Sequence, residues 1–161
     1  MDPILDVLIA NNEYVKGSHV SGLGAGPTRQ LVVLSCMDAR LDLFAALGLK
    51  LGEAHVIRNA GGIMTDDVVR SLLLSSWVLG TRDLLILQHT GCGLHGLNES
   101  ALKDRIEAGS GVRPAVHFGS FDDIERRVRD SVGRARSEPG LRLRRVLGGV
   151  FDMDTGAIRQ V

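Results

Sequence analysis

The chain contains two cysteines, and each lies in a short polar cluster that comes after an apolar run. Cys36 directly follows the run 31–35, and His89 and Cys92 follow the run 84–87. Thiolate sulfur and imidazole nitrogen are ligands that zinc prefers in proteins, and a catalytic zinc site keeps three protein ligands and an open fourth position. The pattern therefore predicts a catalytic Zn²⁺ site formed by Cys36, His89 and Cys92.

Two other interpretations of the cysteines stay open. Cysteine is often a buried apolar residue, so Cys36 and Cys92 could be free core thiols without a metal. A purely structural zinc site is the second alternative, and it needs four protein ligands. The fourth ligand would then be Asp38 or a histidine such as His95. In a reducing compartment, two cysteines indicate a metal site or catalysis rather than a disulfide.

Asp38 and Arg40 lie two and four residues after Cys36, a spacing that puts all three on one side of an extended segment. A carboxylate beside zinc either orients a zinc-bound hydroxide by accepting its hydrogen bond or ligates the ion and closes the site. A bidentate bond from Arg40 would keep Asp38 ionised and turned away from the ion. The pair therefore predicts a switch between an open and a closed site. The simpler alternative is a surface ion pair, which contributes little.

Gly61 and Gly62 belong to the cluster 58–62, which follows the short apolar run 54–57. Glycines at a junction between a strand and a helix allow backbone amides to approach a bound group closely. We therefore expect Gly61 and Gly62 to line the position of a small, oxygen-rich substrate. His55, inside the apolar run, is expected to be a hydrogen-bonded core histidine rather than a metal ligand.

Three continuous apolar runs, 31–35, 54–57 and 84–87, are typical of strands covered on both faces, as in parallel sheets. Segments with helical spacing of apolar residues alternate with these runs. This order predicts one α/β domain over 1–161, with a central, mostly parallel sheet flanked by helices. The ends of adjacent parallel strands are about 4.8 Å apart, so ligands that follow them can share one ion.

The remaining elements are predicted from helical spacing, capping residues and turn signals. An amphipathic helix is expected at the N-terminus. The helices are expected at 1–17, 41–49, 65–79 with Gly80 as the C-cap, 97–108 and 121–135, and they are followed by a half-exposed strand at 141–146 and a hairpin over 150–158.

The charge balance excludes some classes of partner. Lysines and arginines number 19, as do the acidic residues, so the formal net charge is zero. A chain without excess positive charge gives no electrostatic argument for binding nucleic acid or an anionic membrane. No apolar stretch reaches the ~20 residues that span a bilayer, and the N-terminal segment has acids where a signal peptide needs basic residues. We therefore expect a cytoplasmic protein that acts on a small molecule.

Three blocks of the sequence resemble, in order and spacing, the signature blocks of the β-class carbonic anhydrases. They are Cys36-Met37-Asp38-Ala39-Arg40, Arg58-Asn59-Ala60-Gly61 and His89-Thr90-Gly91-Cys92-Gly93. The length of the chain and the stretch 59–67 are most similar to the compact prokaryotic branch of that family. One position departs from this branch, because Gly91 stands where Asp is common. The difference concerns subclass and regulation rather than the ligand set.

The resemblance implies zinc-dependent, reversible hydration of CO₂ to bicarbonate and a proton by a zinc-bound hydroxide. It implies that Cys36, His89 and Cys92 hold the zinc ion and that Asp38 and Arg40 form the catalytic dyad. It further implies a homodimer, or a dimer of dimers, in which the N-terminal helix packs on the partner and the active sites lie near the subunit interface.

Two alternative functions stay open beside carbonic anhydrase. Relatives of the compact branch include hydrolases of carbonyl sulfide and carbon disulfide that keep the same metal ligands, so the three blocks do not separate these activities. A zinc-stabilised binding or sensing protein without turnover is the other alternative. A site closed by Asp38 at every pH would favour it.

Overall fold

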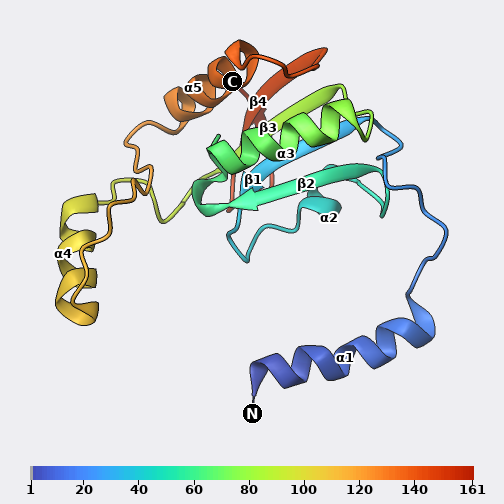
Figure 1. The fold of residues 1–161 in the computed structure, drawn as a ribbon, viewed down its shortest axis with the longest axis horizontal. Helices are drawn as coiled ribbons and strands as arrows, with labels where there is room; N and C mark the ends of the chain where they lie inside the picture. The colour runs from blue at the N-terminus through green and yellow to red at the C-terminus, as the bar shows by residue number, and fades with distance from the viewer. Residues whose placement is uncertain (1) are drawn as a thin grey trace.

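A five-stranded sheet forms the centre of the structure, a computed structural model that describes residues 2–161. Its strands are β1 (Leu31–Cys36), β2 (Ala54–Asn59), β3 (Asp83–His89), β4 (Arg145–Phe151) and β5 (Ile158–Gln160). They pair in the order β2-β1-β3-β4-β5 (Figure 1). The first four are parallel, and β5 runs antiparallel to β4. This arrangement confirms the predicted α/β fold with a central, mostly parallel sheet.

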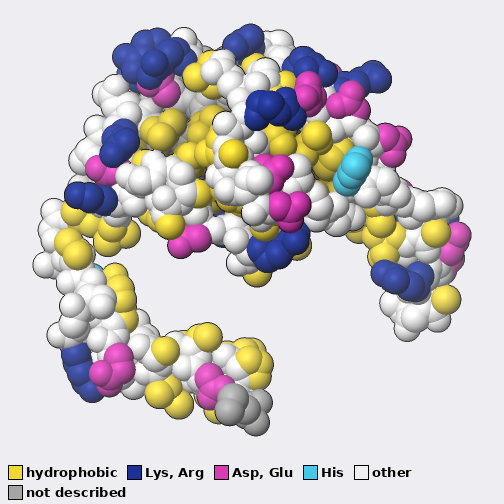
Figure 2. Space-filling view, turned by 180° about the vertical axis from the view of Figure 1, so that it is seen from behind, with side chains coloured by type: hydrophobic (Ala, Val, Ile, Leu, Met, Phe, Trp, Pro, Cys, Tyr) yellow, Lys and Arg dark blue, Asp and Glu magenta, His cyan; other side chains and the backbone are white. Residues whose placement is uncertain are grey.

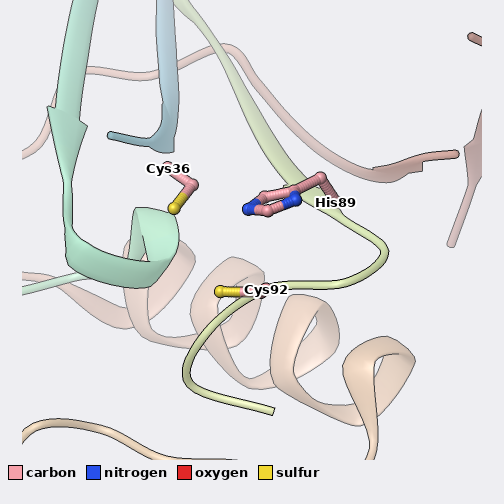
Figure 3. Close-up of side chains that lie close together, drawn as sticks. All are labelled: Cys36, His89 and Cys92. Carbon is pink, nitrogen blue, oxygen red and sulfur yellow. The ribbon is translucent and has the colours of Figure 1, made fainter. Parts of the chain in front are cut away.

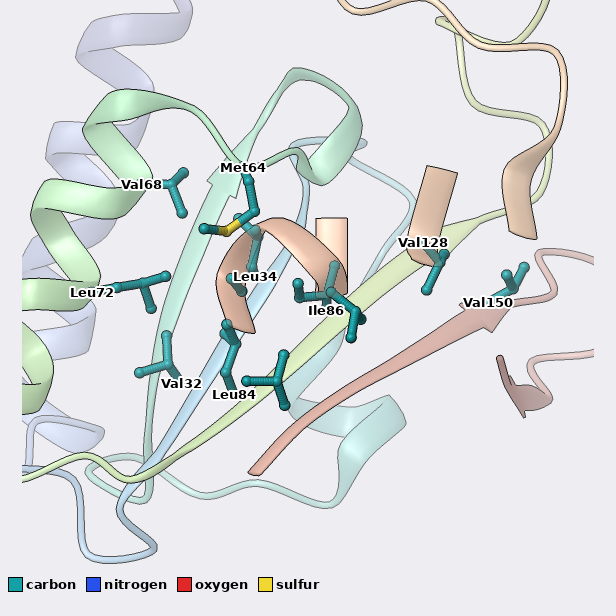
Figure 4. Packing of buried hydrophobic residues seen from close by; sticks show 12 residues of the cluster. Val32, Leu34, Met64, Val68, Leu72, Leu84, Ile86, Val128 and Val150 are labelled. Carbon is teal, nitrogen blue, oxygen red and sulfur yellow. The ribbon is translucent and has the colours of Figure 1, made fainter. Parts of the chain in front are cut away.

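Helices cover both faces of the sheet. Helices α3 (Asp66–Trp77) and α5 (Ile124–Ser137) pack on one face, and the short helix α2 (Leu43–Leu47) packs on the other. Figure 4 shows side chains of α3 and α5 directed at the central strands β1 and β3. Because both faces are covered, β1 and β3 each contain a continuous apolar run, 31–34 and 84–87, as the sequence predicted. The core of the α3 and α5 face includes Val32, Leu34, Leu72, Ile86 and Val128, which are fully buried.

Helices α1 (Pro3–Gly17) and α4 (Glu99–Ser110) project from the sheet instead of packing on it (Figure 1). The predicted N-terminal helix is confirmed, but no residue of Pro3–Gly17 is buried. Ile4, Val7 and Leu8 are 69%, 67% and 62% exposed, and Figure 2 shows hydrophobic side chains along this arm. Isolated helices of this length are marginally stable in water, so α1 lacks the packing that normally stabilises a helix.

The boundaries of α2, α3, α4 and α5 differ from the sequence prediction by one to three residues, and hydrogen bonds explain two of these differences. Helix α3 ends at Trp77, with Val78 as the C-cap, so the predicted end at 79 with Gly80 as the cap is wrong. The chain turns early because Thr81 N donates a hydrogen bond to the Ser75 carbonyl oxygen, which directs it into β3. Helix α4 begins at Glu99, two residues later than predicted, because the Asn98 side chain caps it by accepting from Ala101 N.

The predicted half-exposed strand at 141–146 is wrong. Strand β4 starts at Arg145 and lies inside the sheet, between β3 and β5. Glycines inside β4 weaken the apolar pattern by which a buried strand is recognised in the sequence. A Cβ on Gly148 would lie 2.3 Å from Val128 Cγ1, so only glycine allows α5 to cross this strand closely. The antiparallel pairing of β4 and β5 across the turn 152–157 confirms the predicted hairpin. Within residues 2–161, no helix is long and apolar enough to cross a membrane.

Candidate metal centre

Cys36, His89 and Cys92 lie together at the carboxyl edge of the sheet (Figure 3). Cys36 is the last residue of β1 and His89 is the last residue of β3, and these strands are direct parallel neighbours. One ligand atom from each side chain lies within 4.8 Å of the other two, and all three side chains are buried. The structure thus brings together the three predicted ligands, two of them at strand ends that the sheet holds in fixed register.

Hydrogen bonds fix the loop that carries Cys92. Thr90 N donates to the Phe151 carbonyl oxygen over 3.0 Å, and the Thr90 hydroxyl accepts from Met153 N over 2.9 Å. Gly91 has a φ of +65°, in the left-handed region that glycine adopts without strain. The resulting turn brings Cys92 back toward the two strand ends.

The imidazole of His89 presents an unpartnered nitrogen to the site. Its Nδ1 lies 2.9 Å from the Thr90 carbonyl oxygen, and because a carbonyl only accepts, Nδ1 carries the proton and Nε2 keeps a lone pair. Nε2 is buried and has no hydrogen-bond partner among the residues that the structure describes. Buried polar atoms without a partner are rare. This lone pair, beside the Cys36 and Cys92 thiols, completes a donor set that fits zinc.

The two cysteines are free thiols, which excludes a disulfide. Burial raises the pKa of the Cys92 thiol, and the nearby Cys36 raises it further. Both effects disfavour negative charge in this position unless a cation is near. A divalent cation stabilises thiolates directly and reverses that balance. The surroundings of the thiols therefore agree with a metal centre.

Asp38 and Arg40 form a bidentate ion pair beside the ligand cluster. Arg40 Nε donates to Asp38 Oδ1 over 2.9 Å, and Arg40 Nη2 donates to Oδ2 over 2.8 Å. These bonds hold the pKa of the Asp38 carboxyl well below its usual range. Asp38 Oδ2 lies 3.9 Å from His89 Nε2, and Arg40 Nη2 also reaches the Gly91 carbonyl oxygen over 3.1 Å. The structure thus brings the predicted pair together in the arrangement that leaves Asp38 turned toward Arg40.

Arg58 and Gln88 position the ligand-bearing segments, and the sequence pattern predicted neither role. Arg58 Nε, from β2, donates to the Cys36 carbonyl oxygen over 2.8 Å, and its Nη2 donates to the Asp38 carbonyl oxygen over 2.5 Å. Gln88 is fully buried, and its Nε2 donates to the Gly62 carbonyl oxygen over 2.8 Å. A backbone carbonyl occurs at every residue, so no sequence pattern marks these acceptors.

Gly61 and Gly62 lie in the single turn η1 (Ala60–Gly62), packed against the end of β1. A Cβ on Gly62 would lie 2.7 Å from Cys36 N, and a Cβ on Gly61 would lie 2.5 Å from Leu94 Cδ1. Both residues are buried and have positive φ, +76° at Gly61 and +56° at Gly62. Their close packing explains why glycine is needed here, and their expected contact with substrate stays a prediction.

The two histidines considered as alternatives lie outside the cluster. His95 Nε2 donates to the Asp122 carbonyl oxygen over 2.9 Å, and the ring stacks on Phe121. His95 is therefore turned away from the three candidate ligands. His55 Nδ1 lies 2.8 Å from the Ser75 hydroxyl, in agreement with the hydrogen-bonded histidine predicted there, although its side chain is only half-buried.

Comparison with known proteins agrees with this geometry. A family model described as "Carbonic anhydrase" matches residues 31–117. The Beta-carbonic anhydrase 1 of Mycobacterium tuberculosis is 40% identical over 159 residues, which cover 98% of both chains. A carbon disulfide hydrolase from Acidithiobacillus thiooxidans is 43% identical over 89 residues, which cover 52% of this chain and 45% of that protein.

The fold comparison covers the whole chain. The crystal structure of a carbonic anhydrase from Streptococcus mutans superposes with a TM-score of 0.92 at 34% identity, over 100% of this chain and 98% of that one. The matched family model includes β1, β2 and β3 and all three candidate ligands. The chain therefore belongs to the β-carbonic anhydrase family.

Proposed function

We propose that the protein catalyses the zinc-dependent, reversible hydration of CO₂ to bicarbonate and a proton. The observation that carries this proposal is the buried cluster of Cys36, His89 and Cys92 at the ends of two adjacent strands. Membership of the β-carbonic anhydrase family and the 40% identity to a Beta-carbonic anhydrase 1 along nearly the whole chain support it. Asp38 and Arg40, directly beside the cluster, are its proposed catalytic pair.

The residues of the site have separate roles in the proposed reaction. A zinc ion held by Cys36, His89 and Cys92 would supply the Lewis acidity that activates water near neutral pH. Asp38 accepts a hydrogen bond from the attacking water and orients its oxygen toward CO₂. Arg40 keeps Asp38 ionised and fixes its direction through two parallel hydrogen bonds. The released proton passes to solvent buffer.

The open or closed state of the site depends on the same ion pair. With the Arg40 bonds in place, Asp38 is held away from the ligand cluster. If those bonds break, the carboxylate is free to turn toward the ligands, since its Oδ2 is only 3.9 Å from His89 Nε2. In that position it would occupy the place that substrate water needs. We therefore propose that Asp38 and Arg40 act as a switch as well as a catalytic pair.

The test is stopped-flow CO₂ hydration with zinc-loaded protein and the variants Asp38→Asn and Arg40→Ala. We expect turnover to fall roughly 10²–10⁴-fold in each variant, the usual contribution of a positioned proton acceptor, with one zinc per chain retained. Arg126→Ala is the matched control, because Arg126 is exposed on α5 and its ion pair with Asp130 is long, at 3.9 Å. Two thiolate ligands offset the charge of the ion, so turnover should rise into mildly alkaline pH.

Two outcomes would contradict the proposal. Wild-type protein with one bound zinc and no CO₂ hydration at any pH would remove the proposed activity. Full activity in Arg40→Ala would leave the activity but remove the role of the ion pair.

Hydrolysis of carbon disulfide or carbonyl sulfide is the second candidate function. It is supported by the 43% identity to a carbon disulfide hydrolase across about half of this chain. Turnover of carbon disulfide and of CO₂, measured on one zinc-loaded preparation, separates the two. Higher kcat/KM for carbon disulfide would replace the first proposal by the second.

We also propose that the protein is a cytoplasmic homodimer, or a dimer of dimers, in which α1 packs on the partner. The apolar side chains of α1 are exposed, and a helix with this much exposed apolar surface gains stability by burying it against a second chain. The two free cysteines agree with a reducing compartment.

A further inference from the structure

A cavity lined by arginines lies at the opposite edge of the sheet from the metal centre. It has a volume of about 380 Å³ and lies between the C-terminal end of α5 and the start of β4. Cys36 and His89 end their strands, whereas Arg145 begins one, so the two sites occupy opposite edges of the parallel sheet. The residues that line the cavity include three arginines, Arg136, Arg144 and Arg145, and three leucines, Leu141, Leu143 and Leu147.

One carboxylate holds two of the arginines in place. Asp83, which is 8% exposed, accepts hydrogen bonds from Nε and Nη2 of both Arg144 and Arg145, with the Nη2 bonds at 2.8 and 2.6 Å. These guanidiniums hold the pKa of the Asp83 carboxyl well below its usual range, so the anchor stays ionised. Their Nη1 groups make no hydrogen bond within residues 2–161 and stay free for a ligand.

The third arginine is anchored independently. Arg136 Nη2 donates to the Val146 carbonyl oxygen over 2.8 Å, which fixes its guanidinium on the wall of the cavity. Long side chains usually lose rotamer entropy when they bind a ligand. Because all three guanidiniums are already held by the framework, part of this cost is met before binding. The cavity is therefore preorganised in a way that scattered surface arginines are not.

The local charge is strongly positive, although the chain as a whole has no net charge. Arg144 and Arg145 share a single carboxylate, Asp83, whereas the hydrogen-bond partner of Arg136 is an uncharged carbonyl group. The described residues that line the cavity include no acidic residue. Figure 2 shows Lys and Arg side chains gathered at the upper left, on the edge where the strands begin. An uncompensated group of this kind favours an anion with more than one negative charge.

We propose that this cavity binds the phosphate groups of a small organic phosphate. Planar guanidinium forks match phosphate oxygens with pairs of parallel hydrogen bonds. The leucine wall beside the arginines offers an apolar surface for the organic part of the ligand. The site is separate from the metal centre and does not depend on the proposed activity.

The test is calorimetric titration of the zinc-loaded protein with ADP, pyrophosphate and acetate at low salt, where surface charges are least screened. ADP and pyrophosphate should bind at one site per chain, and acetate should not bind measurably. Arg136→Gln and Arg145→Gln should each weaken binding about tenfold, as expected for loss of a charge-assisted hydrogen-bond pair. Arg136→Lys keeps the charge without the fork and should weaken binding while the protein folds normally. Arg126→Gln, outside the cavity, is the matched control and should bind like wild type.

The outcomes separate the parts of the proposal. Absence of pyrophosphate binding would overturn the proposal. Binding that Arg136→Gln and Arg145→Gln leave unchanged would also overturn it, because the anion would then bind at the metal centre or without a defined site. Equal affinity for ADP and pyrophosphate would overturn the contact of the organic part with the leucines. Tighter binding of ADP would support that contact.

Discussion

Gly62 is the position where one added methyl group tests how closely the metal centre is packed. Its φ is +56°, and a Cβ there would lie 2.7 Å from both Cys36 N and the Ser35 carbonyl carbon. These are backbone atoms of β1, so no side chain can rotate away to make room. The substitution Gly62→Ala must therefore move the end of the strand that carries Cys36.

The size of the effect follows from two costs. A left-handed backbone costs a residue with a Cβ about 1–2 kcal/mol. The contact is about 0.7 Å shorter than the 3.4 Å at which ordinary van der Waals contact begins, and overpacking of this kind costs about 1–3 kcal/mol. We therefore expect Gly62→Ala to lower the free energy of unfolding by about 3 kcal/mol. Because the shift falls on the Cys36 backbone, zinc affinity should fall about 10–100-fold, as when groups that orient ligands are changed.

The assay combines urea unfolding of the metal-free protein with zinc competition against a chromophoric chelator. Gly111→Ala is the matched control, because Gly111 has a φ of +76° at the end of α4 but no atom within 4 Å of an added Cβ. It should cost about 1 kcal/mol and leave zinc affinity unchanged. An equal loss of stability in Gly62→Ala and Gly111→Ala, with unchanged zinc affinity in Gly62→Ala, would refute the close approach of η1 to the end of β1.

Two further predictions concern α4 and α1. Hydrogen bonds from the backbone N–H groups of Ser120, Phe118 and Gly119 lower the pKa of Glu99 to about 2, below its unfolded value of ~4.3. The ionised Glu99 therefore stabilises the fold above pH ~4.3, and this stability is lost as the pH falls toward 2. Glu99→Gln should flatten the fall in melting temperature below pH ~4.3, and an unchanged pH profile would contradict this. Leu8→Asp should shift the protein toward monomer in sedimentation velocity at micromolar concentration, because a buried unpaired carboxylate is costly. Glu13→Gln is its control, because Glu13 lies on the side of α1 opposite to the apolar face. An unchanged dimer in Leu8→Asp would exclude α1 from the interface.

The parallel core could be predicted because local and tertiary preferences agree there. The runs 31–35 and 84–87 are dominated by apolar residues, and the structure buries them from both sides. The start of β4 could not be predicted, because leucines and arginines alternate over much of 141–146 and imitate an exposed strand. What fixes that start is Asp83, which binds both Arg144 and Arg145 from a distant part of the chain. Strand preference depends on such neighbours, and a local pattern does not contain them.

The candidate ligands could be predicted because their chemistry is in their side chains. Two thiols and an imidazole that follow apolar runs indicate zinc from their residue types and positions alone. The groups that hold them in place are different. Arg58 acts on the carbonyl oxygens of Cys36 and Asp38, and Gln88 acts on that of Gly62. Since every residue has such an acceptor, only the three-dimensional arrangement decides which one is used.

Arg40 shows why the site needs a planar guanidinium and not only a positive charge. Its Nε and Nη2 bind the two oxygens of Asp38, in the loop after β1. The same Nη2 donates to the Gly91 carbonyl oxygen, in the loop that carries Cys92 after β3. One side chain thus orients the carboxylate and connects the two loops beside the candidate cysteine ligands. A lysine offers charge without this fork, so the requirement for arginine at this spacing follows from geometry.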